Sequence, residues 1–184
     1  MGQSQIKISL IGSKPPIWRR FVASNSMTLS RFHDLLQIVM GWEDSHLHQY
    51  RVGSQYFGVP DPDFPRNMKN EARVTLAELM PVEGASAIYE YDFGDGWEHK
   101  LVVEKVLPHR GSEPLTRCLG GRRACPPEDC GGIPGYQRLL EAVGDPDHPE
   151  HGALSQWLGD GFDPDRFDVS IVNYELGKHF GRQC

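Results

Sequence analysis

Asp92 and His99 are the two residues of this sequence whose types and spacing point most directly to chemistry. Asp95-Gly96 lies between two stretches of strand-forming residues, and Asp-Gly favours a two-residue hairpin turn because both positions of that turn need a positive φ. With this turn, Asp92 faces His99 across the hairpin; Gly94 also allows a longer loop, which would shift the register. A carboxylate beside an imidazole can orient a general base or hold a metal ion. A cross-strand charge pair that only stabilises the hairpin is the plainer interpretation.

Two further pairs extend this set towards metal binding. His46 and His48 are two residues apart in a predicted strand, a spacing that places both imidazoles on one face. Glu128 and Asp129 follow two prolines and offer adjacent carboxylates, which divalent cations favour. A solvent-facing strand and an ordinary acidic loop explain these pairs equally well. The candidate catalytic residues are Asp92, His99 and Glu128. The candidate metal ligands are His46, His48, Asp92, His99, Glu128 and Asp129.

Three of the four cysteines allow a different metal site. Cys118, Cys125 and Cys130, with His109 upstream, could supply four zinc ligands. Their spacing does not match the two-residue gaps of zinc knuckles and ribbons. Small buried thiols are the commoner outcome for such cysteines, and a reducing compartment disfavours disulfides between them.

The chain is acidic, with 19 Lys and Arg against 25 Asp and Glu and a net charge of −6. Most of this excess lies in the second half, which disfavours indiscriminate wrapping of nucleic acid but allows a local basic patch. The candidates for phosphate or nucleic-acid contact are Arg19, Arg20, Arg122 and Arg123. Arginines that bridge acidic loops are the plainer alternative.

Several common templates are missing from the sequence. It has no phosphate-binding G-x-x-x-x-G-K-[ST], no G-x-G-x-x-G, no H-E-x-x-H and no G-x-S-x-G. P-loop nucleotide hydrolysis, Rossmann cofactors, zincin proteolysis and α/β-hydrolase chemistry therefore lose their usual support. No apolar run is long enough for a membrane helix, and the first ten residues contain no apolar run that could serve as a signal peptide. We expect a cytoplasmic protein with no membrane partner.

Strands come first along the chain, and helices follow. Residues 29–40 keep the helical period, with Thr28 as N-cap, Gly41 at the end, and His33, Asp34 and Gln37 on the exposed face. The other expected helices are short, and the last of them ends at Gly177; they span residues 75–80, 136–143, 149–158 and 169–176. The predicted strands cover residues 6–10, 17–23, 46–52, 55–57, 86–93 and 97–106.

Residues 110–134, rich in Gly, Pro and Cys, are expected to be irregular. The length favours one domain over residues 1–184, strand-rich over 1–110 and made of loops and helices over 111–184. The order of elements predicts an α+β fold with a mainly antiparallel sheet, one amphipathic helix in the N-terminal half and short helices in the C-terminal part.

Several blocks of the sequence together carry a family resemblance. They include Lys14-Pro-Pro-Ile-Trp-Arg-Arg20, Phe32-His-Asp-Leu-Leu-Gln-Ile-Val-Met-Gly-Trp42, Ser45-His-Leu-His-Gln-Tyr50, Tyr89-Glu-Tyr-Asp-Phe-Gly-Asp-Gly-Trp-Glu-His99 and Cys118-Leu-Gly-Gly-Arg-Arg-Ala-Cys-Pro-Pro-Glu-Asp129. Through these blocks the chain resembles the plasmid pRiA4b ORF-3-like family over about residues 4–177. The resemblance implies a bacterial or archaeal α+β domain found on plasmids and beside insertion elements. It supplies no catalytic residues, and the labels transposon passenger and resolvase-like rest on gene context. Cys130 stands where an apolar residue is more usual.

Three hypotheses for the function stay open. The first is a non-catalytic accessory module that binds a protein or nucleic-acid partner of a mobile element. The second is a metal-dependent hydrolase acting on phosphodiesters through Asp92, His99 and Glu128 with a divalent metal. The third is a structural domain stapled by zinc. The sequence favours the first because spacing alone yields no complete catalytic constellation, and it leaves open whether the protein is an enzyme.

Overall fold

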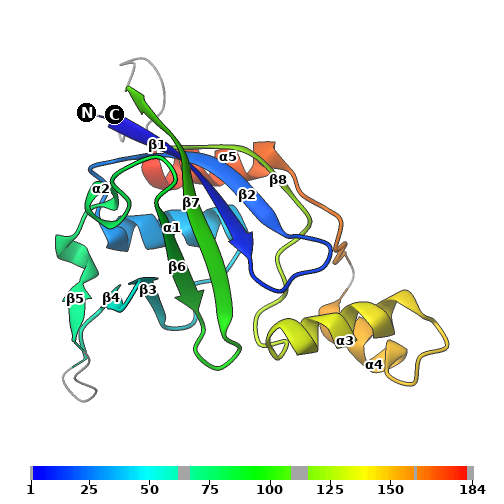
Figure 1. Cartoon of the computed structure of the whole chain (residues 1–184). Coiled ribbons are helices and arrows are strands. Elements are labelled where there is room, and N and C mark those ends of the chain that lie inside the picture. The colour runs from blue at the N-terminus through cyan, green and yellow to red at the C-terminus, as the bar shows by residue number, and fades with distance from the viewer. Residues whose placement is uncertain (1, 62–66, 109–115, 160, 182–184) are drawn as a thin grey trace.

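A mostly antiparallel sheet frames the protein in this computed structural model, which describes residues 2–61, 67–108, 116–159 and 161–181 (Figure 1). Within those residues the sheet has eight strands in the order β5-β4-β3-β6-β7-β1-β2-β8, and only β4 and β5 run parallel. The strands are β1 (Gly2–Leu10), β2 (Trp18–Ser24), β3 (His48–Val52), β4 (Gln55–Gly58), β5 (Met68–Asn70), β6 (Ser86–Tyr91), β7 (Trp97–Pro108) and β8 (Arg117–Arg122).

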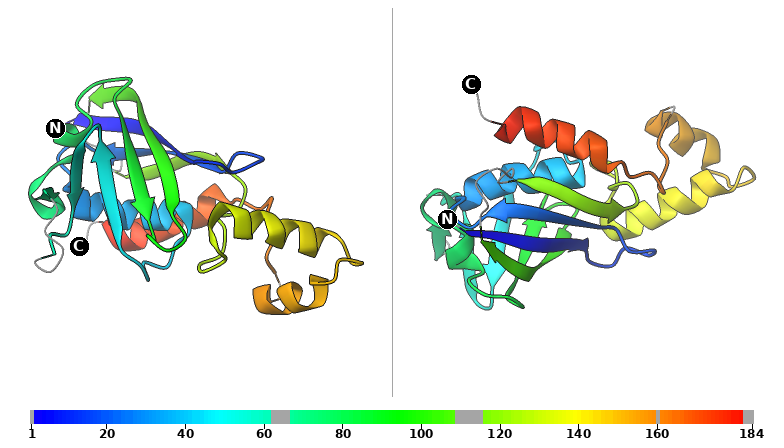
Figure 2. Two further views of the ribbon diagram at one scale, coloured as in Figure 1. Left: turned by 60° about the horizontal axis from the view of Figure 1, so that its bottom comes forward. Right: turned by 90° about the horizontal axis from the view of Figure 1, so that it is seen from above.

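The helices form a layer on one face of the sheet and a projection beside it. α1 packs against β2 and α5, and α5 packs against β8, so one face is covered while the other stays open (Figure 2). α3 and α4 pair as a hairpin that extends from the sheet (Figure 1). The helices are α1 (Leu29–Met40), the 3-10 turn η1 (Glu71–Arg73), α2 (Leu76–Leu79), α3 (Gly132–Gly144), α4 (His151–Leu158) and α5 (Val169–Phe180). The predicted α+β class is confirmed.

The core lies between α1 and the covered face of the sheet. The central strands contribute alternate side chains to it, as the period of two requires. The fully buried residues include Ile6, Ile8, Phe21, Phe32, Leu35, Tyr50, Tyr89, Tyr91, Trp97 and Leu101. Burial of each large apolar side chain contributes about 1.5–3 kcal/mol. The caps predicted for α1 are confirmed: Thr28 accepts from the Arg31 amide, and Gly41 ends the helix with φ 98°.

Several elements differ from the prediction in their extent. β3 begins at His48, so His46 lies in the preceding loop and does not share a strand face with His48. The irregular segment expected over 110–134 contains β8, whose pairing with β2 is a long-range contact that local periodicity does not report. α3 begins at Gly132, and α4 begins at His151. α5 continues past Gly177 to Phe180.

The predicted exposed face of α1 is also wrong at two positions. His33 and Gln37 are buried, because both side chains bond the hydroxyl of Tyr89 beneath the helix. Polar residues at these positions thus satisfy a buried tyrosine rather than face water.

The register of the β6–β7 hairpin overturns the Asp92–His99 pairing. Tyr91 pairs with Trp97 and Tyr89 pairs with His99, which leaves Asp92 in the turn. This register brings the side chains of Tyr89, Tyr91 and Trp97 onto the same buried face. The two-residue turn would put the tyrosines on the face opposite His99 and Leu101, so the hydrophobic pattern excludes it.

Candidate functional site

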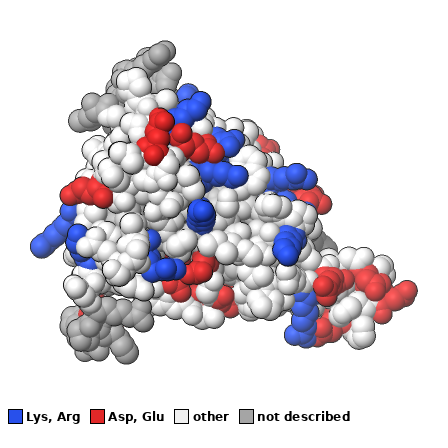
Figure 3. Space-filling model, viewed as in Figure 1, with Lys and Arg blue, Asp and Glu red and all other residues white. Residues whose placement is uncertain are grey.

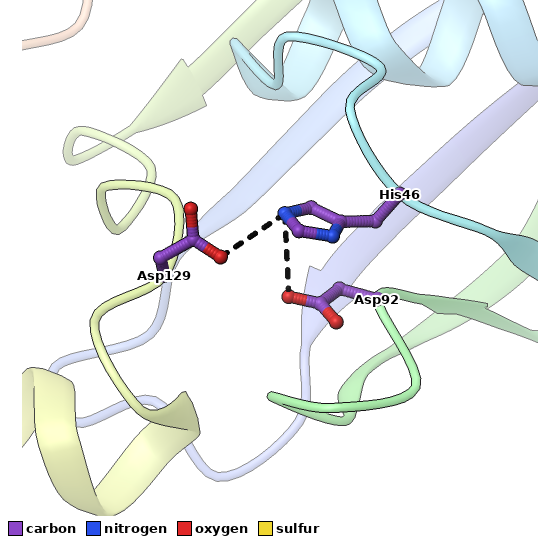
Figure 4. Close-up of side chains that lie close together, drawn as sticks. All are labelled: His46, Asp92 and Asp129. Carbon is purple, nitrogen blue, oxygen red and sulfur yellow. Dashed lines mark ion pairs between the residues drawn. The ribbon is translucent and has the colours of Figure 1, made fainter.

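His46, Asp92 and Asp129 come together where three connections meet (Figure 4). His46 lies in the loop from α1 to β3, Asp92 begins the β6–β7 turn, and Asp129 lies in the loop from β8 to α3. One ligand atom of each residue lies within 4.8 Å of the other two. Among the described residues this is the group of His, Cys, Asp and Glu side chains whose geometry suits a metal ion.

The distances from His46 Nε2 to the neighbouring carboxylates are close to the edges of a coordination polyhedron. His46 Nε2 lies 3.2 Å from Asp129 Oδ1 and 3.7 Å from Asp92 Oδ2, and Glu128 Oε2 lies 3.5 Å away. Ligand atoms at about 2.1 Å from a shared ion stand about 3.0 Å apart in an octahedron and about 3.4 Å apart in a tetrahedron. The side chains are therefore spaced to surround a cation with small adjustments.

The Nε2 atom of His46 has no hydrogen-bond partner within the described structure, although it is buried. Carboxylate oxygens surround it on three sides. A neutral nitrogen with its lone pair aimed at carboxylates is repelled by them, and an unbonded buried polar atom carries a desolvation cost. A proton or a metal ion between these atoms removes both the repulsion and the desolvation cost.

The backbone presents the two aspartates in a conformation that few residues adopt. Asp92 and Asp129 both have φ of 56°, in the left-handed region that Asp tolerates better than most residues. In the turn, Asp92 Oδ1 accepts from the amide of Gly94 at 2.9 Å, which leaves Oδ2 facing His46. The Asp92 side chain is 9% exposed and that of Asp129 is 71% exposed, so the group opens to solvent on the Asp129 side.

Glu128 lies beside this group, and hydrogen bonds fix the position of its carboxylate. Its Oε1 accepts from the Glu43 amide at 2.8 Å and from the Tyr91 hydroxyl at 3.0 Å. The Tyr91 hydroxyl in turn accepts from the Ser45 amide. Burial, together with the adjacent Glu128 carboxylate, raises the pKa of Tyr91, so this hydroxyl keeps its proton and donates it. Glu128 is thereby fixed against the loop that carries His46.

The β8–α3 loop is clamped to the hairpin turn. The Gly131 amide donates to Asp95 Oδ2 at 3.0 Å. A Cβ at Gly132 would stand 2.4 Å from the Asp95 carbonyl oxygen, and Gly132 has φ of 67°. Only glycine allows this approach, which brings Asp129 towards Asp92.

We expect Gly132→Ala to destabilise the protein by about 1–3 kcal/mol, because it combines a backbone clash with a strained φ. Urea unfolding measures this change. Gly120→Ala is the matched control, since a Cβ there meets nothing within 4 Å. Equal effects of the two substitutions would show that the clamp contributes no stability.

His99 does not join the group. It is fully buried, its Nδ1 contacts the Tyr89 carbonyl oxygen at 3.3 Å, and its ring stands edge-on to Trp42. Burial lowers the pKa of His99 to about 4. This imidazole stays neutral within the core, away from Asp92, and the sequence-based catalytic pair is not formed.

The lowered pKa of His99 predicts a loss of stability in acid. The unfolded chain takes up a proton near pH 6.5 and the folded chain only near pH 4, so unfolding gains protons as the pH falls between these values. We expect a loss of about 3 kcal/mol from His99 between pH 7.5 and 4. Urea unfolding across this range measures it, and His99→Gln should flatten the slope. An unchanged slope in this variant would assign the loss to other groups.

His48 belongs to a second polar group, which it forms with Glu71 and His33. Its Nε2 pairs with Glu71 at 2.8 Å, and its ring stacks on His33 with centroids 3.5 Å apart. His33 in turn bonds Asp44 Oδ1 at 2.7 Å. Burial, with the neighbouring His48, lowers the pKa of His33. No pattern in the sequence points to His33 and Glu71 as partners of His48, because they lie on a helix and on the 3-10 turn, far from that strand in the chain.

The arginine candidates divide into structural and surface residues. Arg19 is buried and donates to the carbonyls of Val39 and Met40 at the end of α1 and to that of Arg122. Arg123 is buried against Asp165. Neither guanidinium is available to a phosphate. Arg20 is partly exposed and paired with Glu104, and Arg122 is exposed.

The cysteines stay outside the metal group. Cys118, Cys125 and Cys130 are free thiols, and burial raises the pKa of each. A raised thiol pKa disfavours the thiolate that binds zinc. His109 lies outside the described residues. No described cysteine shares a metal-binding group with other ligands.

The fold and the site define an α+β protein with a histidine and carboxylates gathered where an open sheet meets a helical hairpin. The chain belongs to the plasmid pRiA4b ORF-3-like family, whose model matches residues 3–171. It is 40% identical over 157 residues to the uncharacterised protein y4hQ of Sinorhizobium fredii, covering 84% of this chain and 80% of that protein. The expected family is thereby confirmed.

A solved structure shares the fold. The crystal structure of MM3350, a protein of unknown function from Methanosarcina mazei Go1, superposes with a TM-score of 0.84 at 34% identity. The match covers 92% of this chain and 96% of that one. Within the described residues, no helix has the length and apolar character needed to cross a membrane.

Proposed function

We propose that this protein binds a divalent cation through His46, Asp92 and Asp129 and uses it to hydrolyse phosphodiesters. The observation that carries the proposal is the buried Nε2 of His46, which lies among three carboxylates without a hydrogen-bond partner in the described structure. One imidazole with two carboxylates suits Mn²⁺, Mg²⁺ or Zn²⁺. Three protein ligands leave coordination positions open for water and substrate.

Glu128 is the candidate general base. Its Oε2 lies 3.5 Å from His46 Nε2, beside the group rather than inside it, and two donors fix its Oε1. A cation at the group would lower the pKa of a bound water and neutralise a phosphate, and Glu128 would accept the water's proton. His99, a predicted catalytic residue, has no part in this arrangement because it is enclosed in the core.

Titration of the full chain with Mn²⁺ after removal of bound metal tests the proposal. We expect one Mn²⁺ per chain by isothermal titration calorimetry, and Mn²⁺-dependent hydrolysis of bis(p-nitrophenyl) phosphate. His46→Gln should remove both. The absence of Mn²⁺, Mg²⁺ and Zn²⁺ binding would refute the cation site, and binding without hydrolysis would refute the phosphodiesterase.

The open face of the sheet favours a second candidate function, a module that binds single-stranded nucleic acid. Strand pairing aligns one row of outward side chains across six strands: Arg122, Trp18, Ser9, Lys100, Ile88 and Arg51. At about 4.8 Å per strand this row spans about 24 Å. Figure 3 shows Lys and Arg spread over this face, with acidic residues between them.

An aromatic ring and unpaired cations on this face supply the chemistry of strand binding. Lys7 and Arg20 each stand 5.3 Å from the centre of the Trp18 ring. Stacking on a base and attraction to phosphates are the two main sources of affinity for single strands. Arg20 and Arg51 are already paired, with Glu104 and Glu98, so affinity depends on Lys7, Lys100 and Arg122.

We expect Lys100→Glu to weaken binding of a fluorescent oligo-dT at least fivefold in 50 mM salt and to flatten its salt dependence. Fluorescence anisotropy measures both effects. Lys178→Glu, on the distant α5, makes the same charge change and should leave binding unaltered. Equal losses in the two variants would indicate attraction to overall charge rather than to this face.

A further inference from the structure

Trp157 stands between two cavities beside the candidate metal site. Its side chain belongs to α4 and is 51% exposed, a large apolar surface for a single residue. One cavity, of about 200 Å³, is lined by Asp129, Trp157 and Arg138 among others. The other, of about 260 Å³, is lined by Glu128, Pro126, Phe162 and Trp157. Each cavity therefore joins the indole to one of two consecutive carboxylates.

The size and lining of the cavities limit what can enter them. Each is smaller than the roughly 300 Å³ at which pockets begin to hold drug-sized molecules, so each accepts about one ring system. Each lining combines apolar side chains, Leu139 and Leu154 in one and Pro126 and Phe162 in the other, with charged ones. A ligand that fits has a flat apolar part and an anionic part close together.

Arg138 adds a positive charge to the Asp129 cavity. Its guanidinium donates to both carboxylate oxygens of Glu150, which orients it. A guanidinium has five N–H donors, and this pairing uses two of them. The remaining donors can bind an anion that also approaches a cation beside Asp129.

We propose that the substrate is a phosphodiester that carries a nucleobase, with its phosphate at the His46–Asp92–Asp129 group and its base stacked on Trp157. The proposal rests on the proposed function, and it adds the substrate class. Indole is the aromatic side chain with the largest face, and base stacking on it is tolerant of base identity. The site would therefore accept many nucleotide sequences and reject phosphodiesters without a base.

Matched ligands test this proposal in the presence of Mn²⁺. Thymidylyl-thymidine carries a phosphodiester with bases, and dimethyl phosphate carries the same group without them. We expect calorimetry to show at least tenfold tighter binding of the first. Trp157→Leu keeps an apolar wall but removes the ring, and it should abolish this preference while leaving the Mn²⁺ affinity unchanged. Tyr174→Leu removes a 66% exposed ring on α5, outside both proposed sites, and is the control that should leave the preference intact.

The outcomes separate this proposal from the one on which it rests. If Mn²⁺ binds but both ligands bind equally, or if Trp157→Leu keeps the preference, the substrate class is wrong and the cation site stands. If Mn²⁺ does not bind, the cation site itself fails. If the preference survives both chelator and Asp129→Asn, the base binds independently of the metal group, and the joint placement is overturned.

Discussion

Asp92→Asn is expected to weaken Mn²⁺ binding at least a hundredfold and to leave the fold intact. Asparagine is nearly isosteric, still accepts the Gly94 amide through Oδ1, and adopts a positive φ as readily as aspartate. The substitution therefore removes one negative charge from the group and little else. Because Asp92 is 9% exposed, water replaces that charge poorly. Calorimetry with Mn²⁺ and the hydrolysis assay both measure the effect.

Asp145→Asn is the control for this prediction. Asp145 also accepts a backbone amide two residues on, that of Asp147, so the substitution makes the same local change away from the site. We expect wild-type Mn²⁺ binding in this variant. Undiminished Mn²⁺ binding in Asp92→Asn would exclude Asp92 as a ligand.

Arg19→Met is expected to lower the free energy of unfolding by about 3–5 kcal/mol, because several buried carbonyls would lose their donor at a cost of about 1–3 kcal/mol each. The guanidinium is 2% exposed, satisfies the carbonyls of Val39, Met40 and Arg122, and covers the ring of Phe167 at 4.3 Å. Methionine fills part of the volume but donates no hydrogen bond. The carbonyls that end α1 would lose their hydrogen-bond donor. The positive charge at the negative end of the helix dipole would be lost as well.

Arg20→Met makes the same change at the next residue of β2, whose side chain faces outward and pairs with Glu104. An exposed ion pair contributes at most about 1 kcal/mol, so this control should be close to wild type. Urea unfolding compares the two variants. If they were equally stable, the carbonyls around Arg19 would have found other partners, and its role at the helix end would be disproved.

Local patterns predict only part of this structure. The period and caps of α1 lie within one segment, so the sequence predicts that helix correctly. β8 has two glycines and no clear alternation, and its pairing with β2 lies a hundred residues away in the chain. The hairpin was expected at Asp95-Gly96, but burial of Tyr89, Tyr91 and Trp97 outweighs the preference of a two-residue turn.

The candidate site shows the same limit. His46, Asp92, Glu128 and Asp129 can be selected by residue type, but their meeting depends on three loops from distant parts of the chain. His48 and His99 have the same chemical type and lie in other surroundings, paired with Glu71 or enclosed in the core. Residue type thus identifies which side chains can bind a metal, and only tertiary packing separates those that meet from those that do not.

The hydrogen bonds of Arg19 also bear on how freely each residue of the candidate metal site can move. Through Met40 and Arg122 its guanidinium ties together the points where the loops to His46 and to Asp129 begin. His46 stands six residues from Met40 and Asp129 seven from Arg122, and each loop has a further anchor, at Tyr91 for the His46 loop and at Glu128 and Gly131 for the Asp129 loop. The Asp129 side chain is 71% exposed, so it has the greatest freedom of the three side chains. A cation would therefore enter by way of Asp129 and settle against two ligands already in place.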